Sequence, residues 1–196
     1  MIILIDENVK RIDRKVMRVS VCCVEVDNEN ILYDIRGYVN SIKDDRIRFG
    51  LVDKIHFSSM SEAQRQSVIE YISKINITAK IFIYYYYDIS EHDAKLQSAE
   101  DAVLSIKHIH RGKKLDIKLE EASEYKSSRI AKYCLRGEDL FIVPDGILSV
   151  FLGCLDNVSN RTGASDRMYI LIKEKIRLQV FSFGGKKEYL NSIKRV

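Results

Sequence analysis

The sequence predicts an α/β domain in which a mixed β-sheet carries helices on both faces. Two observations lead to this fold class. The chain begins with three β-prone segments, and no helix is predicted between them. They are 2–5, 18–26 and 31–39, and turn residues follow the first two. Beyond residue 60, apolar segments with a helical period alternate with β-prone segments, which is typical of strands joined through helices.

The first three strands are predicted to be antiparallel neighbours. IILI at 2–5 is continuously apolar, as in a strand buried on both faces, and DEN at 6–8 is expected to end it. The turn residues DNEN at 27–30 separate 18–26 from 31–39, so these two segments are predicted to form a hairpin.

The rest of the chain supplies the helices and the other strands. Ser61 and Gln64 form a capping-box pattern, and Pro144 is suited to open a helix. Helices are predicted at 61–74, 90–110, 123–135, 145–155 and 166–176. Strands are predicted at 77–87, 115–119 and 140–143, with an extended tail at 177–183.

The composition is that of one ordinary globular domain spanning residues 1–196. A formal net charge of +4 permits a nucleic-acid partner but does not require one, since ordinary surface charge that serves solubility explains it as well. None of the four cysteines forms a C-x-x-C pair, so we expect reduced thiols and no structural zinc. With no signal-peptide core and no apolar run of about 20 residues, we expect a cytoplasmic protein without a membrane span.

Acidic residues follow three of the predicted strands. Because neighbouring residues of a strand point to opposite faces, only one of Asp6 and Glu7 can face a given pocket. Glu121 belongs to an acidic cluster with Glu120 and Glu124, just after the predicted strand 115–119. Asp145 follows the predicted strand 140–143. These carboxylates are either metal ligands or ordinary residues at strand ends, helix starts and caps.

The hypothesis that joins the acidic sites is a divalent-metal centre. Two Mg²⁺ or Mn²⁺ ions need several carboxylate oxygens from different strands. The predicted ligands are Asp6, Glu121 and Asp145, with Glu7 as a further catalytic candidate. No phosphate-binding loop, dinucleotide fingerprint, nucleophile elbow or zinc-protease motif offers another chemistry.

A basic segment lies at the end of the predicted helix 90–110. Its side chains either contact nucleic-acid phosphates or stabilise the helix C-terminus. The candidates for phosphate contact are Lys107, Arg111, Lys113 and Lys114. Tyr84–Tyr87 alternate across a predicted strand, where tyrosines either stack on bases or pack in the core.

Four segments, in order, resemble motifs of a known family. LIDENV at 4–9 resembles a first-strand motif Y-I-D-E-S-G, and GILSVFLG at 146–153 resembles a late helix L-Q-L-A-D-L-I-A-G. The segments 54–72 and 173–183 resemble its helix-bearing middle and its basic, aromatic end. The chain is thus similar to domain of unknown function 3800, a ribonuclease-H-like family. The opening ILIDENV is also similar to PIN-like toxin ribonucleases, although a following hairpin fits those poorly.

The resemblance implies a metal-dependent nuclease with acids on the first strand, a middle strand and the late helix. Asp6 and Glu7 match the first position, and Glu121 matches the middle one approximately. Ser149 stands where the family has its late aspartate, and Gly146 where it has glutamine. Asp145 lies one helical turn before Ser149, about 5.4 Å away, on the same helix face.

The sequence therefore supports two functions. One is a nuclease that hydrolyses phosphodiester bonds of DNA or RNA with Mg²⁺ or Mn²⁺. The other is a catalytically inactive ribonuclease-H-like subunit that binds a partner protein in a defence or mobile-element complex, which the serine at position 149 favours. The oligomeric state is left open.

Overall fold

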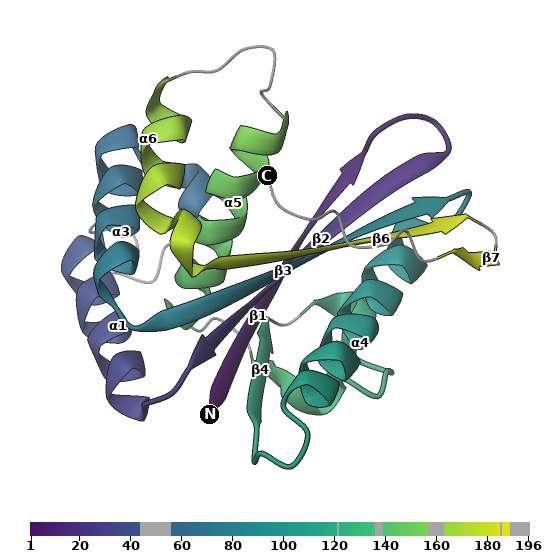
Figure 1. Ribbon diagram of the computed structural model, residues 1–196, viewed down its shortest axis with the longest axis horizontal. Coiled ribbons are helices and arrows are strands. Elements are labelled where there is room, and N and C mark those ends of the chain that lie inside the picture. The colour runs from purple at the N-terminus through teal and green to yellow at the C-terminus, as the bar shows by residue number, and fades with distance from the viewer. Residues whose placement is uncertain (44–55, 121, 136–138, 157–162, 185, 189–196) are drawn as a thin grey trace.

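A computed structural model describes residues 1–43, 56–120, 122–135, 139–156, 163–184 and 186–188. Seven strands form one mixed sheet in the order β5-β4-β1-β2-β3-β6-β7, with helices against both of its faces (Figure 1). The predicted α/β class is confirmed.

The three central strands β1, β2 and β3 are each antiparallel to the next in sequence order, and parallel strands flank them on both sides. β2 (Val16–Val26) pairs antiparallel with β1 (Ile2–Arg11) and with β3 (Ile77–Tyr87). On the other side of β1, β4 (Asp116–Glu120) and β5 (Cys134–Leu135) run parallel to it. The order β3-β2-β1-β4-β5 with these directions is consistent with a ribonuclease-H-like fold.

The segment predicted as an extended tail completes the sheet. β6 (Ile176–Gly184) pairs parallel with β3 across eight residue pairs, and β7 (Lys186–Glu188) returns antiparallel beside it. β3 is therefore an interior strand, as its continuous β-prone sequence predicts.

Two hydrophobic cores lie on the two faces of the sheet. The larger core packs under four helices: α1 (Glu29–Ile42), α3 (Glu62–Lys74), α5 (Ile142–Asp156) and α6 (Gly163–Ile172). The smaller core packs under α4 (Glu91–Ile109). Short 3₁₀ turns complete the layers: η1 (Phe57–Ser59), η2 (Ser123–Tyr125), η3 (Ala131–Tyr133), η4 (Asp139–Phe141) and η5 (Lys173–Lys175).

The predicted strand at 31–39 is wrong, because these residues lie in α1. The helix buries Leu32, Ile35 and Val39, which have the spacing of one helix face. Over so short a segment, the same apolar residues also resemble the apolar-polar alternation of a strand. Asn28, predicted as part of a turn, is the N-cap of α1, and its side chain accepts a hydrogen bond from the Asn30 N–H at 2.8 Å.

The N-terminal hairpin lies elsewhere than predicted. β1 does not end at Asp6 but continues to Arg11, and it turns directly into β2. No glycine marks this turn. Instead, the Asp13 carboxylate accepts hydrogen bonds from the Lys15 and Val16 N–H groups at 2.7 and 2.8 Å. A side chain that organises its own loop is a weaker signal in sequence than Asn-Gly.

Two further predictions fail in the second half of the chain. The residues 140–143 form η4 and the start of α5 rather than a strand, since Pro144 is accommodated within the first helical turn. The predicted helix 123–135 consists of η2, η3 and β5. Within the described residues, no helix is both long enough and apolar enough to cross a bilayer.

The capping box that opens α3 should contribute measurably to stability. The Ser61 side chain accepts from the Gln64 N–H, and the Gln64 side chain accepts from the Ser61 N–H at 3.0 Å. We expect Ser61→Ala to lower the free energy of unfolding by about 1 kcal/mol in urea titrations. The exposed neighbour Ser58→Ala is the control and should have a much smaller effect; equal losses would contradict a capping role.

Candidate functional site

β1 sends its two acidic residues to opposite faces of the sheet. Leu4 belongs to the core under α5, and Asp6, two residues further on, faces the same way. Asp6 is 8% exposed, and its Oδ1 accepts a hydrogen bond from the Glu7 N–H at 2.9 Å. Glu7 instead lies on the α4 face. The two side chains therefore point to opposite faces of the sheet, as the alternation along a strand predicts.

The strand register places Glu120 beside Asp6. Ile5 on β1 is paired with Leu119 on β4, so the next residue of each strand, Asp6 and Glu120, face the same side of the sheet. Glu120 is the last residue of β4, whereas Asp6 lies in the middle of β1, just past its last residue paired with β4. Glu121, the residue predicted for this position, lies outside the described residues. Glu120 belongs to the same acidic cluster of the sequence, and the strand register, which no local pattern encodes, places it on the Asp6 side of the sheet.

Asp145 lies in the first turn of α5, on the same side of the sheet as Asp6. Its Oδ2 accepts a hydrogen bond from the Phe57 N–H at 2.9 Å, and its Oδ1 accepts from the Ser149 hydroxyl at 3.1 Å. The predicted proximity of Asp145 and Ser149 is therefore real. The Asp145 carboxylate also holds the 3₁₀ turn η1 against α5.

The buried thiol of Cys22 lies near both aspartates. Cys22 is the β2 partner of Asp6. Burial raises the pKa of the Cys22 thiol well above its usual range. The neighbouring Cys23 adds to this rise, and so do the negative charges of Asp6 and Asp145. The carboxylates from β1 and α5 thus act on the same small region under α5.

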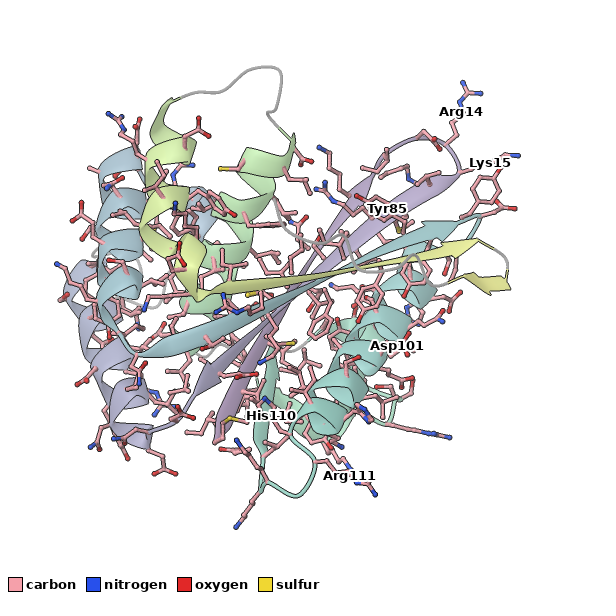
Figure 2. All side chains as sticks on the ribbon, in the orientation of Figure 1. Arg14, Lys15, Tyr85, Asp101, His110 and Arg111 are labelled. Carbon is pink, nitrogen blue, oxygen red and sulfur yellow. The ribbon has the colours of Figure 1, made fainter. Side chains whose placement is uncertain are left out.

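The structure separates the predicted phosphate contacts from these acids. Lys107, near the end of α4, donates to the Tyr133 hydroxyl at 2.6 Å and lies over its ring. Arg111, Lys113 and Lys114 are exposed and precede β4, at the amino ends of the strands. Figure 2 shows Arg111 at the end of the molecule opposite the β1–β2 hairpin. Asp6 and Glu120 lie further along their strands.

Tyr84–Tyr87 mostly serve the core. Tyr84 and Tyr86 are 1% and 3% exposed beneath α4, as the packing interpretation of their alternation predicts. Tyr85 is partly buried on the α5 side, and only Tyr87, at the end of β3, is largely exposed.

On the α4 face, Glu7 belongs to a buried charged cluster. Its Oε1 lies 3.0 Å from Lys95 Nζ, which is also 3.8 Å from Glu124. Although burial alone lowers it, the pKa of Lys95 is raised by these two carboxylates and by Asp6. Burial, and then the charge of Glu7, raises the pKa of the Tyr125 hydroxyl. This geometry gives Glu7 a structural partner on the face away from Asp6.

A second ion cluster joins the far end of α5 to the hairpin. Asp156 accepts two hydrogen bonds from the buried Arg18 guanidinium, at 2.6 and 3.0 Å, and one from Lys10 at 2.9 Å. The bonds from Arg18, with a further contribution from Lys10, lower the pKa of Asp156 to about 2. Sequence analysis did not select these residues, although Arg18 is the only basic residue in the segment 18–26.

Asp6 and Glu120 are the candidates to hold a metal ion at this site. No group of three His, Cys, Asp or Glu side chains among the described residues is arranged to hold a metal. Asp6 and Glu120 nevertheless supply two adjacent carboxylates, which are hard oxygen ligands. Mg²⁺ is commonly held by one or two carboxylates together with waters and substrate phosphates.

No family model, curated protein or solved structure matches this chain. The assignment of functional residues therefore rests on their geometry alone.

The Arg18–Asp156 pair should make stability depend on acidic pH. The folded-state pKa of Asp156 lies below its usual value of 3.8, so the contribution is complete above about pH 5 and is lost as the pH falls toward 2. We expect Asp156→Asn to lower the free energy of unfolding by about 1–2 kcal/mol at pH 7. The difference from wild type should shrink between about pH 4 and 2.

Urea titrations across this pH range measure the difference. Asp116→Asn is the matched control, because its pair with Lys118 is at the surface, with the Asp116 side chain 57% exposed. A loss for Asp156→Asn that is the same at every pH would contradict the assigned charge interaction.

Lys95 should stabilise the fold by neutralising Glu7, whose side chain is only 6% exposed. We expect Lys95→Met to lower the free energy of unfolding by about 2–3 kcal/mol, since it leaves a buried carboxylate without its cation. The second change Glu7→Gln should restore most of this loss. Lys118→Met serves as the surface control in the same urea titrations, and an equal effect there would refute the assignment.

Proposed function

We propose that this chain is a metal-dependent nuclease of the ribonuclease-H-like kind, similar to the domain of unknown function 3800 proteins. The observation that supports the proposal is the register of β1 and β4, which puts Asp6 and Glu120 one residue past the last pair, Ile5 and Leu119, where the parallel pairing stops at the carboxyl end of β4. Functional residues of open α/β sheets collect at such strand ends.

Asp6 and Glu120 would hold the cation. A bound Mg²⁺ or Mn²⁺ would neutralise phosphate charge and make a bound water more acidic. Carboxylate oxygens on neighbouring strands are the kind of hard ligand that Mg²⁺ takes. Their position on two hydrogen-bonded strands fixes their separation before any substrate arrives.

Asp145 would act as the proton acceptor. Each carboxylate oxygen has two lone pairs. The bonds from Phe57 and Ser149 engage one lone pair on each oxygen, which leaves capacity to accept a proton from water. The same two bonds fix the orientation of the Asp145 carboxylate on the α5 side of the sheet.

A specific observation favours a second candidate, the inactive interaction subunit. Both Asp145 oxygens already serve to join η1 to α5, and Glu7 is neutralised by Lys95 on the opposite face. On this alternative the acids stabilise the fold, and the chain acts by binding a partner protein.

A cleavage assay separates the two candidates. The purified chain is incubated with Mg²⁺ or Mn²⁺ and with single-stranded and duplex DNA and RNA. We expect cleavage that chelator abolishes and that Asp6→Asn and Glu120→Gln each reduce about a hundredfold or more. Asp116→Asn, an exposed acid at the other end of β4, is the matched control and should retain activity.

Absence of cleavage by folded wild-type protein on every substrate would contradict the nuclease. Mn²⁺ titration calorimetry then supplies the second readout. If the wild type binds no Mn²⁺, or if Asp6→Asn and Glu120→Gln leave the binding heat unchanged, the interaction subunit is favoured.

A further inference from the structure

The β1–β2 hairpin carries a concentration of positive charge beyond the core of the sheet. Residues 10–18 (KRIDRKVMR) contain five basic side chains and one acidic side chain. Lys10 and Arg18 are engaged by Asp156, whereas Arg11, Arg14 and Lys15 are exposed at the turn. We call residues 11–16 the hairpin arm. Figure 2 shows Arg14 and Lys15 at its tip, pointing away from the body of the protein.

The hairpin arm is held in a defined conformation. The Ile12 N–H donates to the Val16 carbonyl at 2.9 Å, and the Asp13 carboxylate accepts from two N–H groups within the turn. The hydrogen bonds from the Lys15 and Val16 N–H groups lower the pKa of Asp13, because they stabilise its charged form. The Asp88 N–H also donates to the Lys15 carbonyl at 2.8 Å, which ties the arm to the end of β3.

The exposed cations of the arm lack acidic partners among the described residues. Arg11 and Arg14 make no ion pair there, and Lys15 lies 5.8 Å from the centre of the Tyr87 ring. Ile12 and Tyr87 are 48% and 51% exposed beside them. Three outward cations can contact a chain of phosphates, and an exposed aromatic ring can stack on a flat ring of the ligand. A hydrogen-bonded turn that carries both therefore suits a polyanion with planar groups.

The arm lies beyond Asp6, at the carboxyl end of β1. Asp6 and Arg11 are five residues apart on one strand, or about 17 Å. β4 pairs only with Ile2–Ile5, so within the described residues β1 continues past Asp6 without that neighbour. A chain of phosphates that crossed Asp6 and Glu120 could therefore follow β1 to the arm. The basic end of α4 lies at the opposite ends of the strands.

We propose that the hairpin arm binds the sugar-phosphate backbone of a nucleic acid through Arg11, Arg14 and Lys15. The choice of nucleic acid as the ligand rests on the proposed function. The arm replaces the end of α4 as the main backbone contact. Charged residues also protect exposed strand edges from pairing with other chains, and that role alone would require no ligand.

The test compares two triple variants that each remove three exposed positive charges. One is Arg11→Gln, Arg14→Gln and Lys15→Gln in the arm. The other is Arg111→Gln, Lys113→Gln and Lys114→Gln after α4. Fluorescence anisotropy measures binding of short labelled DNA and RNA, single-stranded and duplex, in chelator so that no cleavage occurs. Circular dichroism and thermal unfolding confirm that both variants fold.

We expect the arm variant to bind about tenfold or more weakly at about 50 mM salt. The slope of log affinity against log salt should become shallower by about 2–3 units for duplex, since each lost phosphate contact removes roughly one. The α4 variant should stay within about twofold of wild type. Because both variants lose the same charge, a general effect of net charge would weaken both equally.

Three results would overturn the inference: equal losses in both variants, no nucleic-acid binding by wild type, or arm-dependent binding to anionic phosphatidylserine vesicles in preference to nucleic acid. Failure of the proposed function is distinguishable. Binding that depends on the arm without any cleavage supports the arm and contradicts the nuclease. Metal-dependent cleavage by the wild type, together with an unchanged affinity in the arm variant, supports the nuclease and contradicts the role of the arm.

Discussion

The pairing of β1 with strands on both sides is the constraint on which the rest of the structure depends. β2 holds β1 antiparallel over its full length, and β4 holds its first half in a parallel register. A shift of one residue in either register would exchange Asp6 for Glu7 on the α5 face. The division of the protein into two cores, and of its acids into two environments, follows from this register.

The two faces treat their charges differently. On the α4 side, the buried Glu7 carboxylate pairs with Lys95, which neutralises its charge. On the α5 side, Asp156 meets two cations, and Asp6 and Glu120 face the same way where the pairing of β1 with β4 stops. Asp145, in the first turn of α5, faces the same side of the sheet, and this is why the proposed chemistry is placed on the α5 face.

The same strand connects that chemistry to the hairpin arm. β1 continues beyond the point where β4 stops, and its extension is fixed by β2 and by the Arg18–Asp156 pair. The cations at the turn are therefore presented by a rigid element rather than by a loose loop. An electrostatic surface at a fixed distance from the paired acids is a physical basis for orienting a long anionic ligand.

The sequence by itself determined the elements whose signals are local. Capping residues and helical period located α3 and α4, and β-branched and aromatic residues located β2 and β3. Local pattern failed at 31–39 and 140–143, where helical and strand periods coincide over a few apolar residues. It also missed the hairpin turn, whose signal is the hydrogen bonding of the Asp13 side chain.

Only the tertiary structure decided which acids meet. The sequence pointed to Asp6 and to Glu121 within the cluster of Glu120, Glu121 and Glu124, but the face of the sheet on which Glu120 lies depends on the register of β4 with β1. The separation of the α4 basic residues from the acids, and the union of Arg18 with Asp156 across 138 residues, have the same origin. Strand register and helix packing are long-range contacts, and no local pattern of residues encodes which distant partner each strand will take.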